Sequence, residues 1–365
     1  MSTNVLHLIK GLGPGGAEQL LVNQARASQG GDLDFHVSYL VSWKNHLCAP
    51  LAEAGWVTSC LESDRAWDLR WIPRFRQLLL RERIDVVHDH SPLVSAFARL
   101  VMRTLPKTHR PRSIYTEHNE WGRHRPWTRR LNRLTIGLED HVIAVSDAVK
   151  RSMPASLDVE VLIHGIDIEA VAAQKVHRGA VRHKLGIADD EIVIGIVANF
   201  RKEKACDVLP EAAAQVTAGN PKVWFVSVGQ GPLEAEIRAH HERLGLGDRF
   251  LILGYRDDAT RVMSAFDIFT MASRHEGLPV SLMDALALEL PVVATPVGGI
   301  PDALDESNSI LVEPGDVGAL PAAYTEMAER VELDVIEQAE SGAERFDAHA
   351  AAMTLAEHYR ELNEP

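Results

Sequence analysis

The chain has 365 residues, of which 46% are hydrophobic and 24% charged, and its net charge is −13. This composition excludes a disordered or fibrous protein and predicts a soluble globular protein with two domains. The three cysteines are scattered, which argues against disulfides and a structural zinc site. Because neither a signal peptide nor an apolar membrane span is evident, we expect a cytoplasmic protein, free in the cytosol or at the inner face of the cytoplasmic membrane.

Short apolar, β-branched runs alternate with amphipathic stretches along the whole chain. We predict strands at Val5–Ile9, Phe35–Val41, Asp85–His88, Arg112–Thr116, Val142–Val145, Ile192–Ala198, Lys222–Val228, Phe250–Leu253, Ile268–Met271 and Val292–Ala294. We predict helices at Ala17–Ser28, Pro73–Glu82, Leu209–Ala218, Leu233–Leu244 and Val280–Leu288. This alternation favours an α/β fold with mostly parallel sheets.

A domain boundary is expected near Ile163–Asp167, before a charged stretch and a new strand. The predicted domains are residues 1–165 and 166–347, and a helix within 348–365 is predicted to cross back to the first domain. Open parallel sheets bind ligands at the carboxyl ends of their strands. We therefore expect the two domains to face each other across a ligand-binding cleft.

A glycine-rich turn, GLGPGGAE, joins the first predicted strand to the first helix and contains Gly15 and Gly16. Glycines let the backbone approach a ligand, and the helix end offers N–H groups to phosphate or carbonyl oxygens. The second strand ends in Leu40–Trp43 without the acid that NAD-binding domains place there, and the P-loop spacing is absent. A nicotinamide enzyme and an NTPase are both disfavoured.

A second motif, SRHEGLPVSLMDALA, begins at Ser273 and places a loop acid, Glu276, before a helix that starts near Pro279. Asp284 lies about one turn inside that helix. A nucleotide sugar laid across this element has its hexose near Glu276, its diphosphate at the helix amides and its ribose at Asp284.

Glu276 and Asp284 at this spacing, followed by PVVATPVGGIPD, resemble the E-x7-E signature of the retaining GT-B glycosyltransferases of family 4, the glycosyl transferases group 1. The strings GGAE, IHGID and KACD fall in the order expected for that family. The resemblance covers nearly the whole chain. It implies a GT-B fold of two Rossmann-like domains, with an acceptor-binding domain at 1–165 and a nucleotide-sugar donor-binding domain at 166–347.

The resemblance also implies roles for individual residues. Glu276 would contact the donor hexose, and Asp284, one methylene shorter than the family's glutamate, would hold the ribose hydroxyls. Lys204 matches a lysine that neutralises the donor diphosphate, whereas the family's arginine position holds Asn199, so Arg201 is assigned as its substitute. His118 matches a histidine that hydrogen-bonds the donor. The donor site is completed by Gly15, Gly16, Gly277, Leu278, Pro279 and Val280.

Two acidic or histidine-containing strings resemble metal sites but are interpreted otherwise. Asp32-Leu-Asp34 begins a strand rather than ending one, and His88-Asp-His90 lacks further paired ligands and is interpreted as lining of the cleft. We therefore predict no metal and no cofactor, with the nucleotide sugar as a substrate.

The predicted reaction is retaining transfer of a hexose from a nucleotide diphosphate-sugar to an acceptor hydroxyl, in cell-surface polysaccharide or glycolipid synthesis. A UDP-sugar is the favoured donor and a GDP-sugar the alternative. An epimerase or phosphorylase on the same fold, and a non-catalytic sugar-nucleotide-binding protein, stay open as alternatives. Nucleic acid is not an expected partner.

Residues 99–133 contain ten Lys and Arg but two acids, together with Trp121 and Trp127. This segment predicts peripheral contact with anionic lipid or an anionic, lipid-linked acceptor. The pattern is equally compatible with a solvated helical face above two buried tryptophans.

Overall fold

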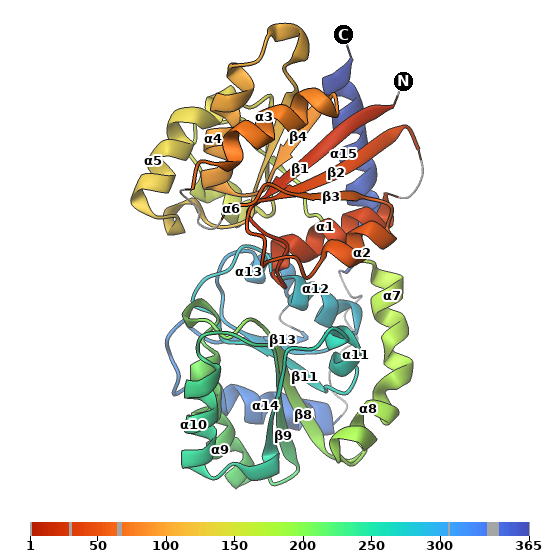
Figure 1. The fold of residues 1–365 in the computed structure, drawn as a ribbon. Coiled ribbons are helices and arrows are strands. Elements are labelled where there is room, and N and C mark those ends of the chain that lie inside the picture. Colours follow the sequence, from red (N-terminus) through yellow and green to blue (C-terminus); the bar gives the residue numbers. More distant parts are fainter. Residues whose placement is uncertain (1, 29–30, 64–67, 306, 334–342, 365) are drawn as a thin grey trace. The chain divides into compact units, whose positions relative to one another are not determined.

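The computed structural model describes residues 2–28, 31–63, 68–305, 307–333 and 343–364. The chain forms two compact units, Met1–Asp167 with Phe346–Pro365, and Ile168–Arg345. Figure 1 shows each unit as a sheet flanked by helices. Pro365, the last residue of the predicted C-terminal segment, lies outside the described residues.

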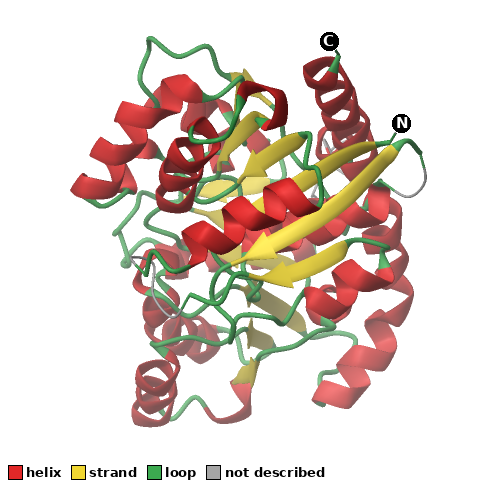
Figure 2. Ribbon diagram, turned by 45° about the horizontal axis from the view of Figure 1, so that its top comes forward, coloured by secondary structure: helices red, strands yellow, loops and turns green. Residues whose placement is uncertain are grey.

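The N-terminal unit contains a seven-stranded sheet in the order β3-β2-β1-β4-β5-β6-β7, and its paired strands are parallel. Its strands are β1 Thr3–Ile9, β2 Leu33–Tyr39, β3 Val57–Cys60, β4 Val86–Asp89, β5 Arg112–Glu117, β6 His141–Ala144 and β7 Glu160–Val161. Its α-helices are α1 Gly16–Ala27, α2 Cys48–Glu53, α3 Trp71–Arg81, α4 Pro92–Arg103, α5 Pro126–Thr135, α6 Asp147–Ser152 and α15 Ala348–Asn363. Figure 2 shows strands side by side with helices packed on them.

The C-terminal unit contains a six-stranded parallel sheet in the order β10-β9-β8-β11-β12-β13. Its strands are β8 Ile192–Val197, β9 Val223–Val228, β10 Phe250–Gly254, β11 Ile268–Met271, β12 Val292–Ala294 and β13 Ser309–Leu311. Its α-helices are α7 Ile168–Ala172, α8 Arg178–Leu185, α9 Leu209–Gly219, α10 Glu234–Leu244, α11 Ala259–Met263, α12 Val280–Ala287, α13 Ile300–Ala303 and α14 Leu320–Glu332.

Strand β1 shows why the apolar runs fold as buried parallel strands. Successive side chains of a strand point to opposite faces of the sheet. Val5 and Ile9 pack in one core cluster, which also contains Leu355 of α15. Leu6 and Leu8 pack in another cluster, with side chains of α3 and α4. Helices cover both faces, so the strand reads as one continuous apolar run.

The strand order of each sheet reverses once, between β1 and β4 in the N-terminal unit and between β8 and β11 in the C-terminal unit. At such a switch point the two loops that leave the carboxyl ends run to opposite faces of the sheet and leave a crevice between them. A ligand-binding site is therefore expected at the loops after β1, β4, β8 and β11.

The ten predicted strands and the predicted helices are present, with ends shifted by at most two residues. Three strands were not predicted: β3, β7 and β13, which lie at sheet edges. They have two to four residues each. Such short segments carry too little periodicity to be recognised, and their extended form depends on pairing with the neighbouring strand.

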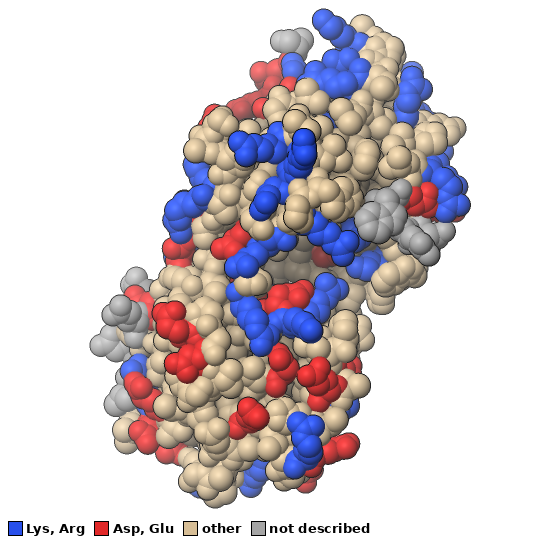
Figure 3. Space-filling view, turned by 90° about the vertical axis from the view of Figure 1, so that its left-hand side faces the viewer, with Lys and Arg blue, Asp and Glu red and all other residues tan. Residues whose placement is uncertain are grey.

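The basic segment 99–133 divides into a structural part and an exposed part. Arg99 is buried against Glu139 and Asn132, so it is not available to a partner. Trp121 is buried, whereas Trp127 of α5 is 40% exposed and Leu134 is 74% exposed. Figure 3 views the side of the N-terminal unit on which α5 lies in Figure 1, and Lys and Arg side chains are spread over it.

No helix in the described ranges is long and apolar enough to span a bilayer.

Candidate active site

At the switch point of the N-terminal sheet, the loop after β1 is joined to the loop after β4. The backbone N–H of Lys10 donates to Oγ of Ser91, at 3.1 Å. The glycine-rich turn follows in the chain, with Gly15 as the N-cap of α1 and Gly16 as its first residue. The first-turn amides of a helix have no carbonyl of a preceding turn to bond. The helix N-terminus formed by Gly15 and Gly16 can therefore bind an anion.

His118 follows the carboxyl end of β5 and belongs to a chain of three histidines. Its Nε2 lies 3.1 Å from Nδ1 of His90, whose Nε2 lies 2.9 Å from Nδ1 of His7. Burial lowers the pKa of His118 to about 3, so its ring is neutral at physiological pH. A neutral imidazole has one donor and one acceptor nitrogen, so the ring nitrogen of His118 that carries the proton is coupled to the tautomers of His90 and His7.

His7 was not identified from the sequence, although a histidine within the apolar run VLHLI was a visible signal. His88 is also buried, and its two ring nitrogens lie 2.7 Å from the hydroxyls of Tyr359 and Thr116. Tyr359 belongs to α15, so the C-terminal helix supports the histidines from the far end of the chain.

At the switch point of the C-terminal sheet, Lys204 and Glu276 form an ion pair. Lys204 Nζ donates to both carboxylate oxygens of Glu276, at 2.7 and 2.6 Å, and Ser273 Oγ donates to Oε1 at 2.6 Å. The Glu276 side chain is 5% exposed and that of Lys204 is 24% exposed. A carboxylate this buried requires a cation and further donors. The partial exposure of Lys204 leaves the ion pair accessible to solvent on the lysine side.

Hydrogen bonds with the segment after β12 hold the Glu276 loop in place. The N–H of Gly299 donates to the carbonyl of Gly277 at 2.6 Å, and Thr295 Oγ1 donates to the carbonyl of Ser273 at 2.5 Å. Gly298 has a φ of +57°, and a Cβ atom there would lie 2.3 Å from the carbonyl oxygen of Glu276. No role was predicted for Thr295 or Gly298, although both lie in the string PVVATPVGGIPD after the predicted helix.

Helix α12 follows this loop, with Pro279 at its N-cap position and Val280 as its first residue. Leu278, just before them, is buried. Asp284 lies four residues into the helix, about 6 Å along its axis from Val280. Burial raises the pKa of Asp284 to about 7, which a hydrogen bond from Thr260 Oγ1, 3.4 Å from Oδ2, only partly offsets.

The loop after β8 carries the other predicted cation, Arg201, and Asn199. Asn199 is half-buried, and the Arg201 side chain is 53% exposed, with its Nη1 3.9 Å from Oε1 of Glu203. Of the two predicted cations, Lys204 is the one in contact with Glu276 within the described part of the chain.

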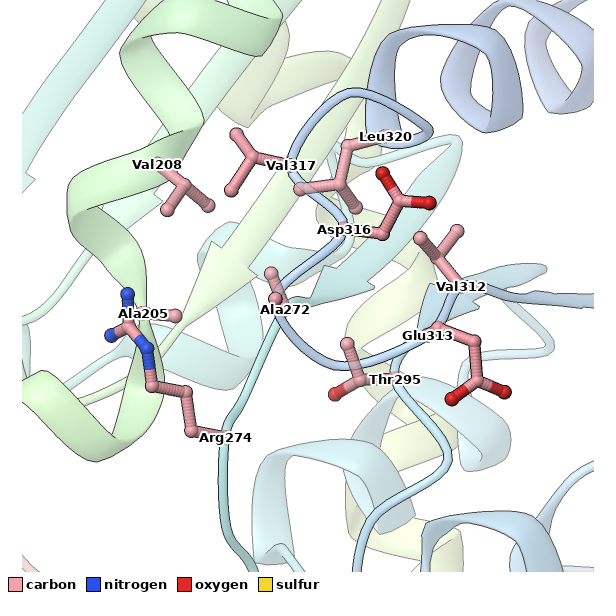
Figure 4. Close-up of a pocket in the computed structure, with 11 residues that line it drawn as sticks. Ala205, Val208, Ala272, Arg274, Thr295, Val312, Glu313, Asp316, Val317 and Leu320 are labelled. Atoms are coloured by element: carbon pink, nitrogen blue, oxygen red, sulfur yellow. The ribbon is translucent and has the colours of Figure 1, made fainter.

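A small pocket of about 20 Å³ lies where β11, β12 and β13 end (Figure 4). Ala272, Thr295 and Val312 line it, together with Arg274, whose guanidinium lies 3.4 Å from the Asp207 carboxylate. This volume suffices for about one water molecule.

Comparison with known proteins identifies the family. The model for "Glycosyltransferase Family 4" matches residues 14–170, and the model for "Glycosyl transferases group 1" matches residues 191–330. The matches together cover most of the chain, and each lies largely within one structural unit. The chain belongs to the family 4, or group 1, glycosyltransferases. The two matches include Gly15, Gly16 and His118 in the first and the region from Asn199 to Asp284 in the second.

Related proteins support the assignment of this chain to the glycosyltransferase family. It is 27% identical to EpsF of Bacillus subtilis over 305 residues, which are 79% of this chain and 78% of EpsF. It is 28% identical to the phosphatidylinositol N-acetylglucosaminyltransferase GPI3 subunit of Saccharomyces cerevisiae over 263 residues, 69% of this chain and 57% of that subunit. This glycosyltransferase thus spans little more than half of the yeast relative.

The structure of Anabaena HepE in complex with UDP-glucose matches 98% of this chain and 99% of that chain, with a TM-score of 0.80 and 22% identity. This likeness shows the fold. The glycosyltransferase has the GT-B fold predicted from its sequence.

Proposed function

We propose that the protein is a retaining, metal-independent hexosyltransferase that uses a nucleotide diphosphate-sugar, with a UDP-sugar favoured. The observation that carries this proposal is the Lys204–Glu276 ion pair at the switch point of the C-terminal sheet, directly before the N-terminus of α12. HepE, which has the same fold, was crystallised with UDP-glucose.

The ion pair is suited to a site in which a bound donor replaces the partners that Lys204 and Glu276 have in its absence. Without a donor, Lys204 neutralises a carboxylate that is almost fully buried. A bound nucleotide sugar supplies a diphosphate, which can accept hydrogen bonds from Lys204, and hexose hydroxyls, which can donate to Glu276. Charge-assisted hydrogen bonds of this kind contribute about 1.5–3 kcal/mol each.

In the proposed reaction the bond between the anomeric carbon and the diphosphate oxygen breaks, and the acceptor hydroxyl attacks the same face of the sugar. The acceptor proton passes to the departing phosphate oxygen. Lys204, Arg201 and the first amides of α12 stabilise the negative charge that develops on the nucleoside diphosphate. His118, held neutral by burial, hydrogen-bonds the donor. Since cationic side chains neutralise the leaving group, no divalent metal is needed.

The acceptor is proposed to be anionic or lipid-linked, in cell-surface polysaccharide or glycolipid synthesis at the inner face of the cytoplasmic membrane. Helix α5 exposes Arg129, Arg130 and Arg133 together with Trp127 and Leu134. Arginines beside exposed apolar side chains favour contact with an anionic lipid surface. The yeast relative is named for transfer to phosphatidylinositol.

The test is binding and slow hydrolysis of a panel of UDP-, GDP- and ADP-sugars in the presence of EDTA. We expect one sugar nucleotide to bind and to be hydrolysed, and Glu276→Gln, which preserves the size of the side chain, to lose turnover. Turnover abolished by EDTA would contradict metal independence. Conversion of the donor to an isomer without acceptor would support an epimerase, and tight binding without any product would support a binding protein.

A further inference from the structure

A group of potential metal ligands lies on the N-terminal unit, outside the residues proposed to bind the donor. His141 is the first residue of β6, Glu160 is the first residue of β7, and His358 lies on α15. One ligand atom from each of the three lies within 4.8 Å of the other two. Nearly 200 residues separate Glu160 from His358, so the fold alone brings these side chains together.

The contacts converge on one carboxylate oxygen. His141 Nε2 lies 2.7 Å from Oε2 of Glu160, and His358 Nε2 lies 2.9 Å from the same oxygen. The two rings are close, with centroids 4.7 Å apart. Although His358 Nε2 is buried and close to the oxygen, it makes no hydrogen bond. Three atoms that can each donate a lone pair therefore surround a small volume, and a cation placed there would satisfy all of them.

We propose that His141, Glu160 and His358 form a Zn²⁺ site that fastens α15 to the edge of the N-terminal sheet. Two imidazole nitrogens and one carboxylate oxygen are typical ligands of zinc, whereas Mg²⁺ and Ca²⁺ prefer all-oxygen sites. Tetrahedral ligands about 2.1 Å from zinc lie about 3.4 Å apart. The present separations of 2.7 and 2.9 Å reach that value through increases of about 0.7 and 0.5 Å, which side-chain rotations can supply.

The surroundings of the three ligands fit this assignment. Their side chains are between 20% and 32% exposed, which gives a metal ion an entry path and leaves a fourth position for water. The other ring nitrogen of His358, Nδ1, lies 4.0 Å from the Glu361 carboxylate. A metal-bound histidine commonly has a carboxylate beside its second nitrogen, which orients the ring and raises its basicity.

The test is isothermal titration calorimetry of the full chain with ZnCl₂ after removal of metals by EDTA. We compare the wild type with His358→Gln, Glu361→Gln and the control His349→Gln, an exposed histidine of the same helix. We expect zinc affinity to fall by at least about 100-fold in His358→Gln, about tenfold in Glu361→Gln and not at all in His349→Gln. Circular dichroism checks that each variant is folded, and His141→Gln repeats the test from the strand.

Thermal unfolding gives a second measurement. Zn²⁺ should raise the unfolding midpoint of the wild type and of His349→Gln but not that of His358→Gln, because a ligand that binds only the folded state stabilises it. Zinc binding that is unchanged in both His358→Gln and His141→Gln overturns the proposal, as does an equal shift of the midpoint by Mg²⁺. Donor hydrolysis should be unchanged in His358→Gln, so failure of this proposal leaves the transferase proposal untouched.

Discussion

Replacement of Gly298 by alanine tests whether the position of the Glu276 loop controls donor turnover. At Gly298 a Cβ atom would lie 2.3 Å from the carbonyl oxygen of Glu276 and 2.7 Å from that of Gly277. The closest favourable separation of carbon and oxygen is about 3.3 Å, so the loop must move by about 1 Å. A displacement of this size costs about 100-fold in rate when it affects catalytic geometry.

The matched control is Gly245→Ala. Gly245 has a φ of +63°, close to the +57° of Gly298, but a Cβ atom there would meet nothing within 4 Å. Both variants carry the cost of a left-handed alanine, about 1–2 kcal/mol. Gly298→Ala has an additional overpacking cost of about 1–3 kcal/mol.

Two assays separate these effects. Urea unfolding followed by circular dichroism should show that both variants lose stability, Gly298→Ala more than Gly245→Ala. Hydrolysis of the donor should fall about 100-fold in Gly298→Ala and stay near the wild-type rate in Gly245→Ala. Equal turnover in the two folded variants would refute the conclusion that the segment after β12 positions Glu276.

Three further predictions concern single side chains. Lys204→Met should weaken donor binding about 10- to 100-fold by calorimetry, whereas Lys202→Met, which removes an exposed charge of the same loop, should not. The pKa of Asp284 is raised to about 7 by burial, so the folded state holds a proton that the unfolded chain releases above about pH 4. The stability of the wild type should therefore decline relative to Asp284→Asn as the pH rises from about 4 to 7, and parallel pH profiles from urea unfolding would contradict this. Tyr359→Phe removes the hydroxyl 2.7 Å from Nδ1 of His88 and should lower the free energy of unfolding by about 1–3 kcal/mol, because a buried nitrogen loses its partner; an unchanged midpoint in urea would count against it.

The candidate donor site was largely visible in the sequence because its parts are local. The string from Glu276 to Asp284 encodes a loop acid, a proline at the helix start and a second acid one turn later, and the structure has a loop and helix α12 in these places. The buried strands were equally readable, since helices on both faces require continuous apolar runs. The roles assigned to the site residues are still predictions.

The contacts that organise the site were not readable from the sequence. The pairing of Lys204 with Glu276 joins the loops after β8 and β11, which become neighbours because the strand order reverses between them. The support of Glu276 by Gly298 requires β12 to lie beside β11. Each of these contacts depends on strand order, which local periodicity does not encode.

The α/β class, the elements with strong periodicity and the family could be predicted from the sequence, because these depend on local patterns of residue type. The contacts among these residues come from the tertiary structure. It paired Lys204 rather than Arg201 with Glu276, buried Arg99, and gathered His141, Glu160 and His358 around one oxygen. The physical reason is that burial, charge pairing and convergence of ligands arise between segments far apart in the chain, where only the packing of the sheets and helices sets the distances.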